Sequence, residues 1–168
     1  QKDWNHPVLD IWVAEFVKTL QAIPAEVQIV AHSFGCLTSI AALARHPELN
    51  AKVKNLLLVA PANPARFGEN GFSRDSQTDY STYFQQLKLQ VPTTLLITDN
   101  DPWFSFDDAH ILAQTWKIKP INLGAVGHVN VASGFGPFPE IEHYLISENT
   151  MPHISKVDES KCYFKFAF

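Results

Sequence analysis

The sequence predicts an α/β fold in which helices cover both faces of a mostly parallel sheet. Short apolar segments rich in β-branched residues alternate with longer segments whose apolar residues recur at helical spacing. Apolar runs of this length are typical of strands buried on both faces, as parallel strands are. The chain has 168 residues, 46% of them hydrophobic, which is enough for one domain with a substantial core.

The first three elements are a helix, a strand and a second helix. Apolar residues recur at helical spacing over residues 9–20 and predict an amphipathic helix that ends before Pro24. The short apolar segment Val27–Ala31 predicts a buried strand. Ala and Leu are abundant from Phe34 to Arg45, so we expect a helix there, which Pro47 stops.

A second buried strand is expected at Leu56–Ala60. The segment between Pro61 and Tyr80 is rich in Gly, Asn, Pro and Ser and predicts a long loop. Loops of this length in compact domains are often functional. A helix over Tyr80–Leu87 and a third strand at Thr94–Thr98 follow.

The remaining elements repeat the alternation. We expect a helix at Phe106–Trp116, a fourth strand at Pro120–Leu123, a Gly-rich loop over Gly124–Gly136 and a last helix at Glu140–Ile146. Residues 1–146 would then form one domain. Residues 147–168 change to a polar and then aromatic character, and we expect them to be a C-terminal extension without an assigned structure.

Composition excludes several classes of protein. Thirteen basic and seventeen acidic residues give a net charge of −4, which provides no surplus to neutralise nucleic-acid phosphates. No apolar run approaches the roughly 20 residues that span a bilayer. We therefore expect binding to neither nucleic acid nor membrane. The two cysteines form no Cys-x-x-Cys pair, so we expect a reduced, cytoplasmic protein.

The segment Ala31–Gly35 joins the first expected strand to the following helix and is suited to a nucleophile elbow. Such a strand-to-helix turn raises a serine hydroxyl above the sheet and requires small residues around it. Gly35 meets this requirement on one side of Ser33, and Ala31 replaces the more usual glycine on the other. The backbone N–H of Phe34, at the positive end of the helix, is a candidate oxyanion-hole donor.

A serine nucleophile needs a base, and the base needs an orienting group. Asp101 follows the third expected strand and His128 follows the fourth. Because the carboxyl ends of parallel strands meet at one edge of the sheet, we expect both side chains near Ser33. The chain order Ser, Asp, His is the one expected of α/β-hydrolases.

Three segments carry a resemblance to a family: Ala31–Leu37, Asp99–Trp103 and Gly127–Gly134. They resemble the small serine hydrolases related to retinoblastoma-binding protein 9 and the bacterial YdeN-type proteins, over roughly residues 4 to 145. Val59–Ala62 fits the same pattern. The resemblance implies an α/β-hydrolase-like three-layer sandwich without a large lid, with Ser33, Asp101 and His128 as a catalytic triad.

The resemblance also implies a preceding strand and a glycine-containing loop that supplies a second oxyanion donor. Because the sequence starts at Gln1 with a helical pattern, we expect a sheet that lacks this N-terminal strand and loop. A sheet edge exposed in this way favours pairing with a second copy of the chain. A homodimer through this edge is therefore an expectation.

Each candidate residue also has an ordinary structural interpretation. Ser33 is equally suited to be a plain helix N-cap. Asp101 could only begin a turn, and Asp99 competes with it for the orienting role. His128 could be a loop histidine bonded to a carbonyl. Cys36, close to a helix N-terminus, is either a thiol of lowered pKa or a small buried residue, and we favour the buried residue.

A set of side chains near the elbow and in the loops could line a substrate pocket or, alternatively, cap the core: His32, Phe67, Phe72, Trp103 and Phe104. We expect His32 to be structural or pocket-lining rather than the base, since the residue beside an elbow nucleophile points elsewhere. The remaining histidines show no metal-ligand spacing, so no metal or cofactor is expected.

The sequence therefore predicts a carboxylesterase-like serine hydrolase that acts on a small carboxylic ester, or on a thioester or amide, as its acyl substrate. Ser33 would attack, His128 would act as the base and Asp101 would orient His128. The alternative is a catalytically weak or inactive hydrolase fold that binds a protein partner. Two features favour that alternative: the expected absence of the first strand and the presence of an aromatic tail.

Overall fold

A parallel sheet lies at the centre of the molecule. The computed structural model describes residues 4–67 and 80–145, and in them the sheet has four parallel strands in the order β1-β2-β3-β4. The strands are β1 (Val27–Ser33), β2 (Val53–Pro61), β3 (Thr93–Ile97) and β4 (Ile121–Asn122). This arrangement confirms the predicted α/β fold.

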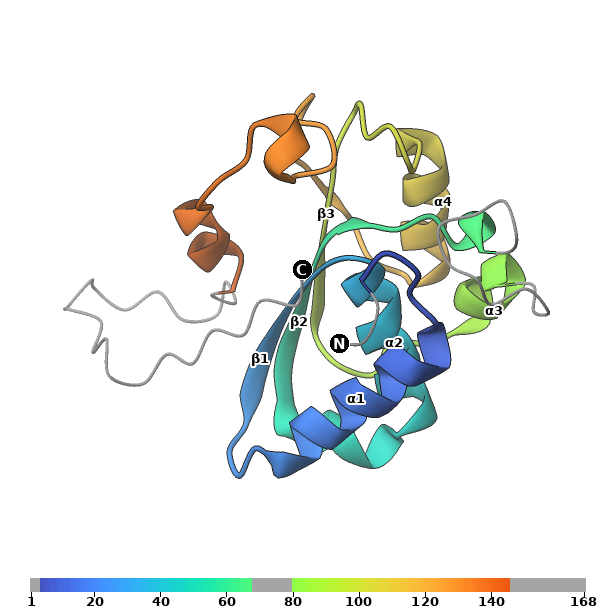
Figure 1. Cartoon of the computed structure of the whole chain (residues 1–168), viewed down its shortest axis with the longest axis vertical. Helices are drawn as coiled ribbons and strands as arrows, with labels where there is room; N and C mark the ends of the chain where they lie inside the picture. Colours follow the sequence, from blue (N-terminus) through green and yellow to red (C-terminus); the bar gives the residue numbers. More distant parts are fainter. Residues whose placement is uncertain (1–3, 68–79, 146–168) are drawn as a thin grey trace.

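Each pair of neighbouring strands is connected by a segment that contains a helix (Figure 1). A first helix precedes β1, and the following helices lie between successive strands. The helices are α1 (Leu9–Ala22), α2 (Phe34–Arg45), α3 (Tyr80–Gln86) and α4 (Phe106–Thr115). Their positions confirm the helices that apolar spacing predicted, with small shifts at the ends.

The two faces of the sheet are covered by different parts of the chain, and the α-helices of residues 4–67 and 80–145 pack on one face, not on both as predicted. In β2, Leu56 and Leu58 join the main core with residues of α1, α2, α3 and α4. Leu57 and Val59 point to the opposite face, where they pack with Leu145 in a smaller cluster. Successive side chains of a strand alternate between faces, so a run of four apolar residues supplies both clusters.

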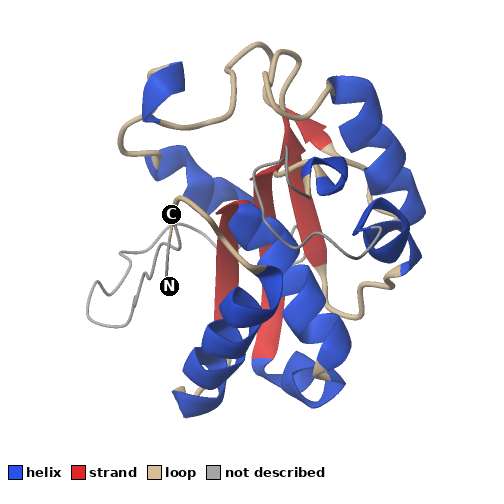
Figure 2. Ribbon diagram, turned by 45° about the vertical axis from the view of Figure 1, so that its right-hand side comes forward, coloured by secondary structure: helices blue, strands red, loops and turns tan. Residues whose placement is uncertain are grey.

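The helix α2 is the most deeply buried element of the described chain. Every residue from Phe34 to Leu43 is buried, because the sheet covers one side of the helix and α1 covers another. The rings of Trp12 in α1 and Phe34 meet edge to face with centroids 5.0 Å apart. Figure 2 shows α1 and α2 in front of the strands. This packing holds the first turn of α2 in place at the end of β1.

The chain differs from expectation after β4. The last predicted helix, Glu140–Ile146, is wrong in type: the chain forms the 3₁₀ helix η4 (Pro139–Tyr144). Bonds between residues three apart, such as Leu145 N–H to the Glu142 carbonyl, replace the α-helical pattern. The segment is short and starts at a proline, and short turns of this kind favour 3₁₀ geometry. The predicted fourth strand is also shorter than expected, at two residues.

Some expected features lie outside the described residues. Of the predicted loop between Pro61 and Tyr80, the structure describes the part up to residue 67, which contains the 3₁₀ helix η2 (Pro64–Arg66). A further 3₁₀ helix, η1 (Pro47–Lys52), follows α2. Phe72 and the C-terminal extension fall in the segments that are not described.

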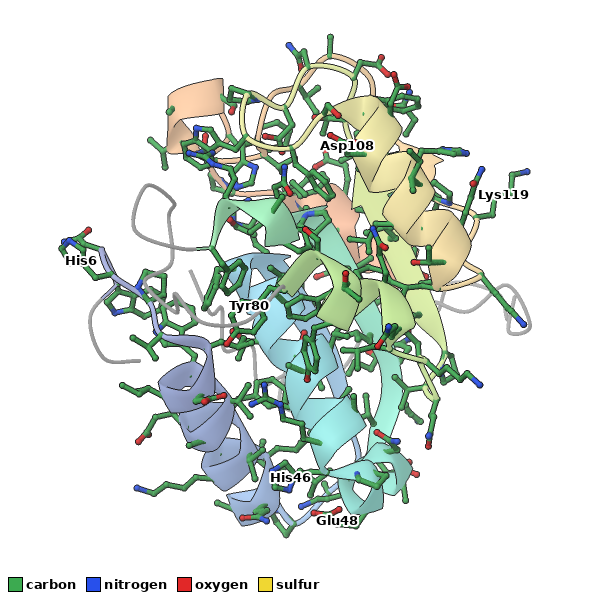
Figure 3. The ribbon with its side chains drawn as sticks, turned by 90° about the vertical axis from the view of Figure 1, so that its right-hand side faces the viewer. His6, His46, Glu48, Tyr80, Asp108 and Lys119 are labelled. Atoms are coloured by element: carbon green, nitrogen blue, oxygen red, sulfur yellow. The ribbon has the colours of Figure 1, made fainter. Side chains whose placement is uncertain are left out.

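The molecule has a clear polarity along its strands. Figure 3 shows Asp108, in the first turn of α4, at one end of the molecule, and His46 and Glu48 at the opposite end. The carboxyl end of β3 lies at the Asp108 end, because α4 follows it. None of the helices in residues 4–67 and 80–145 has the length and apolar character needed to cross a bilayer.

Candidate active site

Ser33 lies in a strained turn between β1 and α2, with no intervening loop. Its backbone has φ +53° and ψ −122°, a region that residues other than glycine rarely adopt. The register between β1 and β2 shifts at this point, so that Ser33 pairs with Pro61. The Ala62 N–H donates to the Ser33 carbonyl at 3.1 Å. The turn therefore has the sharp strand-to-helix geometry expected of an elbow.

The Ser33 side chain does not cap α2, although Ser33 occupies the N-cap position. Its hydroxyl instead lies 2.8 Å from His128 Nε2, across 95 positions of sequence. The N-terminus of α2 begins at the next residue, Phe34, and carries a positive partial charge. The Ser33 side chain therefore contacts an imidazole and makes no capping hydrogen bond to the helix.

Asp101 contacts the other nitrogen of the same imidazole. Asp101 Oδ2 and His128 Nδ1 are 2.6 Å apart, and the two side chains are only 5% and 2% exposed. Asp101 Oδ1 accepts the Trp103 N–H at 2.8 Å, which fixes the carboxylate. Because a carboxylate accepts hydrogen bonds, Nδ1 carries the proton and Nε2 is left to accept the proton of the Ser33 hydroxyl.

The competing aspartate, Asp99, makes a different contact. Its Oδ1 accepts the side-chain N–H of Asn122 at 2.7 Å, and the residue is exposed. Of the two candidate aspartates, only Asp101 reaches His128 in the described structure. Both aspartates follow the end of β3, and the sequence favours Asp101 because it lies further past the strand and directly before the aromatic loop.

Side-chain hydrogen bonds join the loops that carry Asp101 and His128. The Asn100 side chain accepts the Gly127 N–H at 2.7 Å, and the Thr98 hydroxyl donates to the Gly127 carbonyl at 2.7 Å. Sequence reasoning missed these residues. Polar residues directly beside the expected catalytic aspartate were the available signal.

The loop after β4 adds a second set of contacts around the base. Ser133 Oγ accepts the His128 N–H at 3.0 Å, and the Asn130 side chain accepts from both the hydroxyl and the N–H of Ser133. Gly127 has φ +67°, and a Cβ atom there would lie 2.5 Å from Ser133 Oγ. The position therefore requires glycine on two counts.

The expected pocket residues separate into two groups. Trp103 is 45% exposed, and its ring centroid lies 4.4 Å from that of His128. Phe104 is buried in the main core, and Phe67 packs against that core with its ring 4.3 Å from Tyr80. Trp103 thus borders the site, whereas Phe104 and Phe67 cap the core. Phe72 lies outside the described residues.

His32 also borders the site. Its ring centroid is 4.9 Å from that of His128, and its Nε2 lies 2.7 Å from the His128 carbonyl oxygen. Burial lowers the pKa of His32, an effect that the hydrogen bond to the His128 backbone opposes. The ring is therefore disposed to stay neutral beside His128.

Cys36 is fully buried, two residues beyond Phe34. Its thiol contacts the carbonyl oxygens of Ala31 at 3.2 Å and Val59 at 3.4 Å. Burial raises the pKa of the thiol, which keeps it protonated. This placement agrees with the interpretation of Cys36 as a small buried residue.

The arrangement is suited to nucleophilic chemistry at a carbonyl carbon. A hydroxyl, an imidazole that accepts its proton and a carboxylate that orients the imidazole form a continuous chain of hydrogen bonds at one sheet edge. Within residues 4–67 and 80–145, no group of three His, Cys, Asp or Glu side chains is placed to hold a metal ion.

Comparison with known proteins gives a family and a set of similar folds. A sequence model described as serine hydrolase matches residues 1–147. A solved structure of a YdeN-like hydrolase from Pectobacterium atrosepticum is 30% identical, with a TM-score of 0.69, over 86% of this chain and 71% of that one. The comparison with curated proteins found no match.

Two further structures share the fold at lower identity. The ydeN gene product of B. subtilis is 17% identical, with a TM-score of 0.60, over 83% of this chain and 74% of that one. An N-formylmaleamic acid deformylase from Pseudomonas putida is 15% identical, with a TM-score of 0.53, over 76% and 71% of the two chains. The matches to YdeN-type proteins confirm that part of the resemblance found in the sequence.

Proposed function

Because the chain belongs to the serine hydrolase family, we propose that it hydrolyses a small carboxylic ester through Ser33, His128 and Asp101. Membership of the family and the likeness to YdeN-type hydrolases support a hydrolytic activity. The assignment of Ser33, His128 and Asp101 to this activity rests on two consecutive hydrogen bonds. They connect the Ser33 hydroxyl to His128 at 2.8 Å and His128 to Asp101 at 2.6 Å.

In the first half of the reaction, Ser33 Oγ forms a bond to the ester carbonyl carbon while its proton moves to His128 Nε2. The carbonyl π electrons move to the oxygen and give a tetrahedral intermediate. As the carbonyl forms again, the bond to the alcohol oxygen breaks and His128 gives that oxygen its proton. The alcohol leaves, and the acyl group remains on Ser33.

In the second half, water replaces the alcohol. His128 Nε2 accepts a proton from water as the water oxygen bonds to the acyl carbon. The tetrahedral intermediate then releases Ser33 Oγ, which takes the proton back from His128. Asp101 stays ionised throughout and stabilises the imidazolium that forms in each half. The products are a carboxylic acid and the regenerated serine.

The negative oxygen of each intermediate needs a compensating charge. Phe34 directly follows Ser33, and its backbone N–H belongs to the first turn of α2. The helix dipole places partial positive charge at this end of the helix. We assign Phe34 this role in the reaction. Trp103, exposed beside the His128 ring, provides an apolar surface for the substrate. A thioester or an amide would follow the same steps.

The test is hydrolysis of p-nitrophenyl acetate by the full chain and by two serine variants. We expect Ser33→Ala to lower kcat by at least about 10³-fold, since the nucleophile is lost. Ser39→Ala is the matched control: its buried hydroxyl bonds only to carbonyls of α2, so it leaves catalysis intact.

Equal rates in the wild type and Ser33→Ala, with both proteins folded by circular dichroism, would contradict the proposal. No turnover above background in either folded protein would favour the alternative, a hydrolase fold that binds a partner with little turnover.

A further inference from the structure

Both backbone groups of His128 are bound by side chains from elsewhere in the chain. The N–H donates to Ser133 Oγ at 3.0 Å, and the carbonyl oxygen lies 2.7 Å from His32 Nε2. Ser133 is five positions away, whereas His32 is 96 positions away in β1. The peptide group that follows His128 is therefore connected directly to the strand that presents Ser33.

The backbone at this point is strained and needs such support. Val129 has φ +51°, a conformation that a β-branched residue rarely adopts. Gly127, on the other side of His128, also lies in the left-handed region, at φ +67°. Strain of this kind persists only where surrounding contacts hold the backbone in place. The contact from His32 reaches the carbonyl between His128 and Val129.

The position of His32 in β1 explains how it reaches that carbonyl. Side chains alternate along the strand, and Ala31 packs into the main core while Val30 packs on the opposite face with Leu57 and Leu145. His32 lies on the same face as Val30. Because a carbonyl only accepts, Nε2 of His32 carries a proton and donates.

We propose that His32 is a positioning residue, which holds the His128 loop in the conformation that aligns the imidazole with both Ser33 and Asp101. The proposal rests on the function proposed above. The hydrogen bond from His32 to the His128 carbonyl connects the strand that carries Ser33 to the loop that carries His128. This connection is independent of the bond between the Ser33 and His128 side chains. The hydrogen bond of His32 goes to the backbone of His128 and not to the reacting atoms of its ring.

The charged groups that face His32 agree with a neutral ring. His128 and Asp101 are the titratable groups that act on it, one opposing its protonation and the other favouring it. A positive charge on His32 would disfavour the imidazolium that forms on His128 during the reaction. Burial disfavours protonation of His32. The neutral ring donates the same hydrogen bond without repelling the imidazolium of His128.

The first test compares kcat and KM for p-nitrophenyl acetate in three variants. His32→Leu removes the donor, and we expect kcat to fall by about 10- to 100-fold with KM changed by less than about threefold, since misalignment of about 1 Å costs up to 10²-fold. His32→Gln places an amide N–H where Nε2 was, so it restores kcat to within about fivefold of the wild type.

Gln28→Leu is the matched control. Gln28 is on the same face of β1, and its side chain also donates to a backbone carbonyl, that of Leu145, at 3.2 Å. Its loss should leave kcat unchanged. Wild-type kcat in His32→Leu, or equal losses in His32→Leu and His32→Gln, would overturn the positioning role. An inactive wild type would instead contradict the proposed function.

A second measurement does not depend on any variant or on activity. Nitrogen-15 NMR of the full chain reports which nitrogen of a neutral imidazole carries the proton. We expect His32 as the Nε2–H tautomer at neutral pH, because Nε2 faces a carbonyl oxygen. A neutral His32 with its proton on Nδ1 would overturn the proposal, even if every variant failed to fold.

Discussion

Asp99 and Asp101 differ by two positions and have different surroundings. Asp101 is nearly inaccessible and receives hydrogen bonds from His128 and from the Trp103 backbone. Asp99 is exposed and bonds to Asn122. Burial strengthens the interaction of a carboxylate with its partner, so only Asp101 is suited to stabilise an imidazolium.

We predict that Asp101→Asn lowers kcat for p-nitrophenyl acetate on the order of 10⁴-fold, with little change in fold. The amide introduced by this substitution would donate to His128 Nδ1, and the imidazole would then present a proton, instead of a lone pair, to Ser33. Steady-state kinetics on the purified variant measure this effect.

The control for this change is Asp99→Asn, which alters the same loop and the same charge. We expect it to keep kcat within about threefold, because Asp99 has no contact with the imidazole. If the two variants were equally impaired, the assignment of Asp101 as the orienting group would be wrong.

His32 gives a pH dependence of stability whose sign follows from its burial. Burial lowers the pKa of His32 from its ordinary value of 6.5, so below that pH the unfolded chain binds a proton more readily than the folded one. The contribution of His32 to stability is therefore fully present above pH 6.5 and is lost as the pH falls from there through the lower, folded-state pKa.

We predict that the free energy of unfolding falls between about pH 7.5 and about pH 5.5 and that His32→Gln makes this fall smaller. Urea unfolding at the two pH values measures it. His46→Gln is the control, since His46 is a surface residue whose ring pairs with the exposed Glu48. A fall of the same size in His32→Gln and the wild type would contradict this origin.

The loop after β4 is the element on which the geometry of the base depends. Gly127 combines a positive φ with close contact to Ser133, whose hydroxyl accepts the His128 N–H. An alanine there would have to move Ser133 and adopt a strained backbone at once. The loop therefore links the conformation of one glycine to the position of the imidazole.

We predict that Gly127→Ala destabilises the protein by about 1–3 kcal/mol and lowers kcat as well. Gly136→Ala is the matched control in the same loop, because its φ is not in the left-handed region and nothing lies within 4 Å of an added Cβ. Thermal unfolding and kinetics on both variants test the prediction. Wild-type kcat in a folded Gly127→Ala would show that the loop does not set the position of His128.

The helices and strands could be predicted from the sequence because their apolar residues repeat with the period of each element. Leu9 and Leu20 belong to the buried side of α1, and the apolar run in β2 supplies both faces of the sheet. The segment after Phe138 could not be predicted in the same way. Its type depends on the proline at its start and on short-range turns, which periodicity does not capture.

The meeting of Ser33, Asp101 and His128 could be predicted because each follows a strand and all parallel strands end at the same edge. The sequence also favours Asp101 over Asp99, because Asp101 lies further past the strand and directly before the aromatic loop. The supporting bonds from His32, Asn100 and Ser133 could not be predicted. They depend on how the loops close, which no repeat in the sequence encodes.

At the scale of the whole molecule, the sheet brings together three segments that are distant in the chain. The Ser33–His128 contact spans 95 positions, and the contact of His128 with Asp101 spans 27. The buried helix α2 and the strained turn before it fix the position of Ser33. Hydrogen bonds between the loops after β3 and β4 fix Asp101 and His128. The groups are thus arranged before a substrate binds, which is what electrostatic stabilisation of a transition state requires.

We propose that Ser33 is a nucleophile activated by this arrangement. Treatment of the full chain with a fluorophosphonate, followed by intact mass and peptide mapping, measures the reactivity of its hydroxyl. We predict a single adduct on Ser33 that forms in the wild type and in Ser39→Ala and is absent from Ser33→Ala. A folded wild-type chain without an adduct, or an adduct on another residue, would contradict the role of Ser33 as the nucleophile.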